Sequence, residues 1–201
     1  PLSVKNLIRE KEAVKNNIKY IIIMALLSVT IFNTLIYIAG HSTTAINLSL
    51  IAISTPVFII LISHWLLKEK TSIAGWIGVA ITIAGVVLLI CRGSLSVLMS
   101  ISFSAGDIWM TIAAVIFALY SILLRRKPAG IGHMTFLAAT FGIGSAMLLP
   151  LFLIERFFQP VINFTPEVII SIFYTGIFAS ITAFFLWNRS VEIIGATKAG
   201  I

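Results

Sequence analysis

The residues of this sequence that could do chemistry are polar side chains placed inside long apolar segments. Asn33 and Tyr37 follow one another at the spacing of four that puts two side chains on the same helix face, and Asn47 and Ser54 are seven apart and also share a face. Amide and hydroxyl groups exchange hydrogen bonds with water or a ligand, and they are costly in lipid without a partner. We therefore expect these groups either to line a wet cavity or to bond across helices as structural contacts.

Further candidates of the same kind lie in two later apolar segments. Trp109 and Tyr120 are three helical turns apart, and Asn188 lies at the end of the last segment beside Trp187. Trp109 and Tyr120 each carry one hydrogen-bonding group on an aromatic ring, and Asn188 places an amide in an apolar helix. The same two interpretations, cavity lining or contact between helices, hold for them.

Pro56 lies near the middle of an apolar segment, with Ser54 and Thr55 immediately before it. A proline has no backbone N–H, so the Ala52 carbonyl is expected to be left free and the helix to bend. Membrane helices tolerate such a break where protein or a water-filled cavity covers the backbone. The break therefore predicts either a functional bend near the membrane midplane or a kink that only improves packing.

The groups that most enzymes and metal sites need are missing from the apolar segments. The acidic residues lie in loops or near the expected helix ends, and the three histidines are separated along the chain. The single cysteine, Cys91, excludes an internal disulfide and a multi-cysteine metal site. We expect no catalytic residue, no metal and no cofactor. The acidic residues are Glu10, Glu12, Glu69, Asp107, Glu155, Glu167 and Glu192.

The composition is that of a membrane protein. Of the 201 residues, 59% are hydrophobic and only 10% are charged, whereas a soluble domain has about a quarter charged residues. The apolar residues form runs near the ~20 residues that a helix needs to cross a bilayer. The sequence predicts an all-α polytopic transmembrane helix bundle. The six predicted spans are Tyr20–Ala39, Thr44–Leu67, Ser72–Ile90, Asp107–Leu124, His133–Ile154 and Glu167–Trp187.

The net charge of +7 reports orientation in the membrane. Of the fourteen Lys and Arg residues, only Arg92 and Arg156 fall on one side of the predicted spans, and the other twelve fall on the opposite side. Cytoplasmic loops retain Lys and Arg, so residues 1–19 are predicted to be cytoplasmic. This distribution does not indicate a nucleic-acid partner.

Small residues at helical spacing mark faces on which helices can approach closely. On the fifth predicted span this stripe consists of Ala138, Gly142 and Ala146. We expect it to be a packed face rather than a substrate contact.

Three blocks of the sequence resemble the EamA-domain permeases of the drug/metabolite transporter superfamily. Residues 37–90 carry a small-residue turn before Ala45, the mid-helix Pro56 and the acidic Glu69 after the helix. Residues 106–126 begin with Gly-Asp and end in basic residues. Residues 181–200 contain Trp-Asn followed by a Gly-Ala turn. Gly40, His41 and Lys70 depart from the family's usual residues.

The resemblance implies two inverted five-helix repeats, incomplete at both ends. Residues 1–91 would be the C-terminal part of the first repeat (helices three to five), residues 92–106 an extracytoplasmic linker, and residues 107–201 the N-terminal part of the second (helices six to eight and the start of nine). Asn33, Tyr37 and Ala45 align with Phe184, Asn188 and Ala196 at a constant offset of 151 residues. Five spans separate the two segments, and an odd number inverts the second relative to the first.

What the resemblance implies about function is a secondary transporter of the bacterial inner membrane, working by alternating access with export as the expected direction. Its partners would be a small metabolite, amino acid or drug-like compound and the surrounding lipid; oligomeric state stays open. Two alternatives stay open too, an intramembrane lipid-modifying enzyme and a non-transporting membrane scaffold. The residues implied to line the substrate path are Asn33, Tyr37, Asn47, Ser54, Pro56, Trp109, Tyr120, Phe184 and Asn188.

Overall fold

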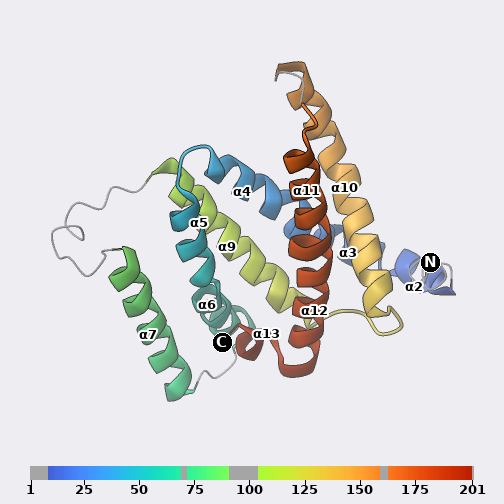
Figure 1. Ribbon diagram of the computed structural model, residues 1–201. Helices are drawn as coiled ribbons and strands as arrows, with labels where there is room; N and C mark the ends of the chain where they lie inside the picture. The colour runs from blue at the N-terminus through green and yellow to red at the C-terminus, as the bar shows by residue number, and fades with distance from the viewer. Residues whose placement is uncertain (1–8, 69–71, 91–103, 159–162, 201) are drawn as a thin grey trace.

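The computed structural model of the chain describes residues 9–68, 72–90, 104–158 and 163–200. Every regular element within these ranges is a helix (Figure 1), which confirms the predicted all-α fold. Cys91, Glu69 and residues 92–103 of the predicted linker lie outside the described residues.

Five stretches of the described chain are long and apolar enough to cross a membrane. They are Ile18–Gly40, Ala45–Leu67, Ala105–Leu124, His133–Phe158 and Pro166–Ile194. The remaining predicted span corresponds to α7 (Ile73–Ile90), a helix of 18 residues. All six predicted spans are therefore helical, but α10 (His133–Phe158) runs four residues beyond Ile154 and includes Pro150.

Two of the spans contain a π-helical segment between two α-helices. The remaining elements, in chain order, are α2 (Lys11–Asn16), α3 (Ile18–Ala25), η1 (Leu26–Ile31), α4 (Phe32–Gly40), α5 (Ala45–Ile53), α6 (Thr55–Leu67), α9 (Ala105–Leu124), α11 (Pro166–Tyr174), η2 (Thr175–Thr182), α12 (Ala183–Ile194) and α13 (Ala196–Ala199). Here η1 and η2 are the π-helices, which are rare and occur frequently at functional sites.

Helix α9 is the centre of the bundle and packs against α4, α5, α6 and α12. Its buried residues Ala118 and Tyr120 belong to the main core, with side chains of α3, α6, α10 and α12, whereas Ala113 packs with Ala39 of α4 in a smaller cluster. Large apolar side chains point outward elsewhere, as Trp65 and Phe157 do, with 82% and 86% of their surfaces exposed. Such an outer surface suits lipid as solvent.

Helix α10 packs on the first span through Gly144. A Cβ on Gly144 would lie 2.5 Å from the Cβ of Val29, and the Thr30 hydroxyl lies 3.4 Å from the Gly144 carbonyl oxygen. Gly142 is exposed, with nothing within 4 Å of a Cβ placed there. The predicted stripe through Gly142 is therefore wrong for this contact, because the helix turns the neighbouring face, which contains Gly144, toward η1.

Candidate functional site

One end of the bundle, called the outer end because the distribution of Lys and Arg predicts that it faces away from the cytoplasm, is held by Asp107 in the first turn of α9; the opposite end is called the inner end. One Asp107 carboxylate oxygen accepts hydrogen bonds from the Thr43 hydroxyl and, at 3.3 Å, from the Asn47 amide. The other accepts the Ser104 backbone N–H at 2.9 Å, which completes a capping box with the Ser104 side chain. Asp107 thus joins the start of α9 to the turn between α4 and α5, and Asn47 is bound within this contact.

Gly106 explains why the two helices can meet there. A Cβ on Gly106 would lie 2.5 Å from the Ala39 carbonyl oxygen and 2.8 Å from the Thr43 Cβ. Only a residue without a side chain fits so close to the neighbouring backbone. The Gly-Asp pair is therefore a structural clamp between α9 and the α4–α5 turn.

Asn33 and Tyr37 lie on the exposed side of α4. The Asn33 amide donates to the Val29 carbonyl at 2.7 Å and lies 3.4 Å from the Ser28 carbonyl, so it serves the backbone of the π-helix before it. The Tyr37 hydroxyl donates to Glu155 of α10, and its ring meets His41 edge-on at 4.8 Å. The two side chains thus have separate partners on this face.

The helix breaks at Ser54, as Pro56 predicts: α5 ends at Ile53 and α6 begins at Thr55. The expectation of a free Ala52 carbonyl is wrong, because the Thr55 hydroxyl donates to it at 2.7 Å. The Ser54 hydroxyl lies 3.3 Å from the Leu50 carbonyl. The hydroxyl residues beside the proline therefore supply the hydrogen bonds that the broken backbone lacks, which is how membrane helices tolerate proline.

A cavity of about 240 Å³ opens beside this break, between α5, α6, α7 and the end of α13. Its lining is mostly apolar or backbone. Gly75, Gly78 and Thr82 of α7 form one wall, and Pro56 and Gly200 form part of the other. Space of this size holds an apolar group but offers few hydrogen-bonding partners. Pro56 is the one predicted path residue among those that line it.

Tyr120, Phe184 and Asn188 come together between α9 and α12. The Tyr120 hydroxyl donates to the Asn188 side-chain carbonyl at 2.7 Å, and both residues are almost fully buried. The Phe184 ring centre lies 5.9 Å from that of Tyr120 and 5.5 Å from that of Phe141. In the described conformation this group is a packed contact that holds one buried hydrogen bond.

A second hydrogen bond joins the same helices one residue away, and no motif in the sequence predicts it. The Trp187 indole N–H donates to the Ser121 hydroxyl at 3.0 Å, and the Trp187 ring centre lies 5.3 Å from that of Phe117. Trp109, by contrast, is 40% exposed near the outer end of α9. The predicted pairing of Trp109 and Tyr120 along one face does not place them in one environment, because α12 covers only the inner end of α9.

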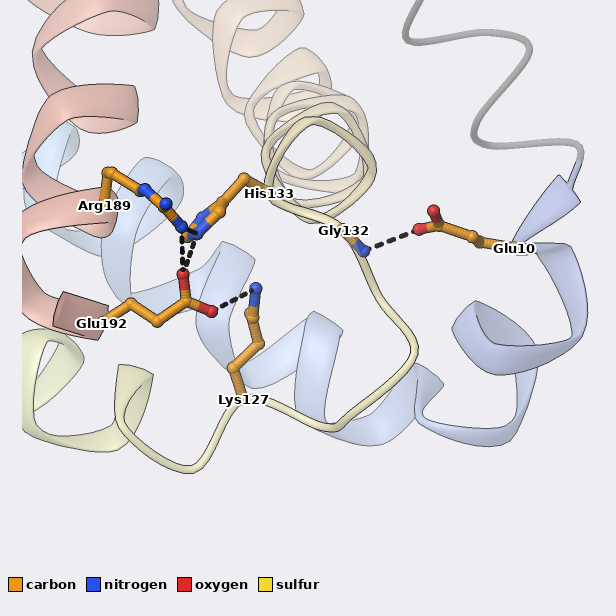
Figure 2. Close-up of polar contacts among 6 residues, drawn as sticks. All are labelled: Glu10, Lys127, Gly132, His133, Arg189 and Glu192. Carbon is orange, nitrogen blue, oxygen red and sulfur yellow. Dashed lines mark hydrogen bonds and ion pairs between the residues drawn. The ribbon is translucent and has the colours of Figure 1, made fainter.

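The inner end of the bundle carries charged contacts (Figure 2). One Glu192 carboxylate oxygen lies 3.1 Å from Lys127 Nζ, and the other contacts His133 Nε2 and lies 3.2 Å from Arg189 Nη1. Lys127 belongs to the turn after α9, His133 begins α10, and Glu192 lies in the last turn of α12. Glu192 therefore joins the end of α12 to the α9–α10 turn, which lies about 60 residues earlier in the sequence.

Glu10 occupies the opposite side of the same turn. Its carboxylate accepts the Gly132 backbone N–H at 2.7 Å, just before the start of α10 (Figure 2). This hydrogen bond holds the pKa of Glu10 below its usual value, because it favours the charged carboxylate. Glu10 thus supplies the anion at the N-terminus of α10 that Gly132, without a side chain, cannot provide.

The nine predicted path residues do not meet at one place within the described residues. Three form the Tyr120 contact, Asn47 belongs to the Asp107 clamp, Ser54 and Pro56 lie at the α5–α6 break, and Asn33, Tyr37 and Trp109 are exposed. Among the described residues, no three His, Cys, Asp or Glu side chains gather as metal ligands do. The arrangement can bend a helix, bond helices to one another and enclose a small apolar group.

Long apolar helices with polar contacts between them and charges near their ends define a multi-pass α-helical membrane protein. The sequence profile of the EamA-like transporter family matches residues 3–91 and again residues 104–201. The chain belongs to this family, which confirms the resemblance.

Several curated relatives share this similarity over most of the chain. An uncharacterized transporter of Archaeoglobus fulgidus is 29% identical over 180 residues, which are 89% of this chain and 61% of the relative. The uncharacterized transporter YyaM of Bacillus subtilis is 25% identical over 96% of this chain and 63% of its own length. The chain thus spans less than two thirds of the length of these relatives. No solved structure is significantly similar to it.

Proposed function

We propose that the chain is the central part of a secondary transporter that moves small metabolites, amino acids or drug-like compounds across a bacterial cytoplasmic membrane, with export as the direction. Two inverted halves, residues 1–91 and 107–201, would alternate about a site near the midplane and open it to one side at a time. Membership of the EamA-like transporter family supports the transport class. The direction and the substrates rest on the family resemblance alone.

The observation that carries the proposal is the agreement between the two halves. The family profile matches the chain twice, on either side of residues 92–103. Helix boundaries repeat at the predicted offset: α4 begins at Phe32 and α12 at Ala183, and α5 begins at Ala45 and α13 at Ala196, both 151 residues apart. In both halves the helix that begins at this boundary follows a π-helix, η1 ending at Ile31 and η2 at Thr182. A shared irregularity at equivalent positions supports two copies of one unit.

Interrupted helices within the spans also support the proposal. The α5–α6 break, its cavity and the two π-helices put non-α backbone at membrane depth in three places. Discontinuous helices near the midplane are typical of secondary transporters. We propose that Asn33, Tyr37, Ser54 and Pro56 face the substrate path in the assembled protein.

Counterflow in liposomes that hold the complete protein tests this function. We expect labelled compounds from a broad panel of amino acids and drug-like cations to accumulate above the level of empty vesicles. Asn33→Ala and Tyr37→Phe should each reduce this uptake about tenfold without lowering the amount of inserted protein, since one lost hydrogen bond of about 1.4 kcal/mol corresponds to a factor of ten. Tyr174→Phe, at an exposed position on α11, is the control and should leave uptake unchanged. An absence of uptake across the panel would contradict the proposal.

A further inference from the structure

The Glu192 cluster consists of Glu192, Lys127, His133 and Arg189 and lies at the end of the bundle that is predicted to face the cytoplasm. We propose that Glu192 is the positioning residue of an ionic latch that holds the end of α12 against the α9–α10 turn, and that this latch opens when the protein exposes its path to the cytoplasm. The inference rests on the proposed alternating access. Lys127 and His133 supply the contacts from the turn side, and Arg189 supplies one from α12 itself.

One side of the latch is anchored. Glu10, the residue before α2, binds the Gly132 N–H, and the Tyr20 hydroxyl of α3 donates to the Leu123 carbonyl at the end of α9 at 3.0 Å. Both contacts fix the turn between α9 and α10, on which Lys127 lies and at whose end His133 lies. In the proposed motion the turn is the fixed partner, and the end of α12 is the member that moves.

The contacts beneath the latch are the polar pairs between α9 and α12. Asn188 precedes Glu192 by one helical turn and bonds to Tyr120, while Trp187 bonds to Ser121. If the end of α12 moves away from α9, these buried hydroxyl and amide groups become accessible to cytoplasmic water. The latch therefore covers groups that could form hydrogen bonds with a substrate once water reaches them.

The cluster joins two largely buried side chains to two side chains that are exposed to water. The Lys127 and His133 side chains are 12% and 18% exposed, whereas those of Glu192 and Arg189 are 42% and 54% exposed. Ion pairs in contact with water are weak singly and gain from joining a network. Because Lys127 and His133 both contact Glu192, removal of its charge weakens two contacts from the turn together and leaves the contact of 3.3 Å between Arg189 Nη1 and His133 Nε2.

Thiol labelling from the cytoplasmic side tests the latch in the complete protein. In a Cys91→Ser background, Ser121→Cys places a reporter at a fully buried position under the latch, and Thr135→Cys places one at a fully buried position in the first turn of α10. Inside-out vesicles are treated with a membrane-impermeant maleimide. We expect Glu192→Gln to raise the labelling rate at position 121 at least threefold, with position 135 unchanged, and Glu192→Asp to restore the original rate.

Glu167→Gln, at the other end of the same span, is the matched control and should change neither rate. An unchanged rate at position 121 would overturn the inference, and so would an equal rise at both reporters, which would indicate general loss of packing. If the protein shows counterflow but Glu192→Gln leaves the labelling rate at position 121 unchanged, the latch is refuted and the proposed transport stands. A selective rise without counterflow by the unsubstituted protein would support the moving contact and count against the proposed transport.

Discussion

At the scale of single residues, acidic side chains bind the ends of helices to their neighbours. Asp107 joins α9 to the α4–α5 turn, Glu155 accepts from Tyr37, and Glu192 and Glu10 hold the inner end. A carboxylate is costly in the apolar centre of the bilayer but cheap near headgroups and water. The position of the acids near span ends follows from the sequence. Their partners do not, because they lie as far as 122 residues away.

The Glu10 contact predicts a dependence on acidic pH. The pKa of Glu10 is lower in the folded protein than in the unfolded chain, so its stabilisation is complete above the unfolded pKa of roughly 4.3 and is lost as the pH falls through the folded pKa. A nitroxide on Asn16→Cys of α2, in a Cys91→Ser background, should gain mobility over that acidic range. Glu10→Gln should remove this transition, whereas Glu12→Gln should retain it. A transition that persists in Glu10→Gln would contradict the assignment.

The Tyr120–Asn188 hydrogen bond predicts a loss of stability on removal of one partner. Tyr120→Phe leaves the buried Asn188 oxygen without its donor and should lower the free energy of unfolding by roughly 1 kcal/mol. Equilibrium unfolding in mixed micelles measures the change. Tyr174→Phe, at a position that is 64% exposed, should leave the stability unchanged. Equal stabilities of the two variants would mean that the buried bond contributes nothing.

At the scale of helices, hydrophobic runs and proline predict where the helices lie. They do not predict the detailed backbone geometry within them. The α5–α6 break followed from Pro56, although the role of Thr55 did not. The π-helices η1 and η2 carry no signal of their own, because they differ from an α-helix by a shift of one residue in hydrogen bonding. The Thr182 hydroxyl donates to the Ile177 carbonyl five residues back, a contact that only the π geometry places in reach.

The choice of packed face was also beyond the sequence, and two glycines of α10 test it. Gly144→Ala would place a Cβ 2.5 Å from Val29, so we expect the free energy of unfolding to fall by roughly 1–3 kcal/mol. Gly142→Ala meets open space and should be neutral or stabilising by up to about 1 kcal/mol, since alanine favours the helix. Unfolding in the same mixed micelles compares the two variants. The reverse order would show that α10 contacts the first span through its other face.

At the scale of the whole molecule, short turns alternate between two ends of the bundle (Figure 1). The α4–α5 turn and residues 163–165 before α11 lie at one end, and the α9–α10 turn lies at the other with α13. The basic residues Lys127, Arg125 and Arg126 belong to the second end. The distribution of Lys and Arg therefore agrees with the direction of the helices, and it predicts which end faces the cytoplasm.

This orientation can be measured with three single cysteines in a Cys91→Ser background. Arg126→Cys lies in the α9–α10 turn, while His41→Cys and Phe164→Cys lie at the opposite end, and all three positions are exposed. An impermeant maleimide should label position 126 only in inside-out vesicles and positions 41 and 164 only in right-side-out vesicles. The two outer positions belong to different halves, so they must agree if both halves cross the membrane as described. Labelling of positions 41 and 164 from opposite sides would contradict the order of the membrane spans. Labelling of all three positions with the reverse sidedness would show the opposite orientation in the membrane and would place the Glu192 latch outside the cell.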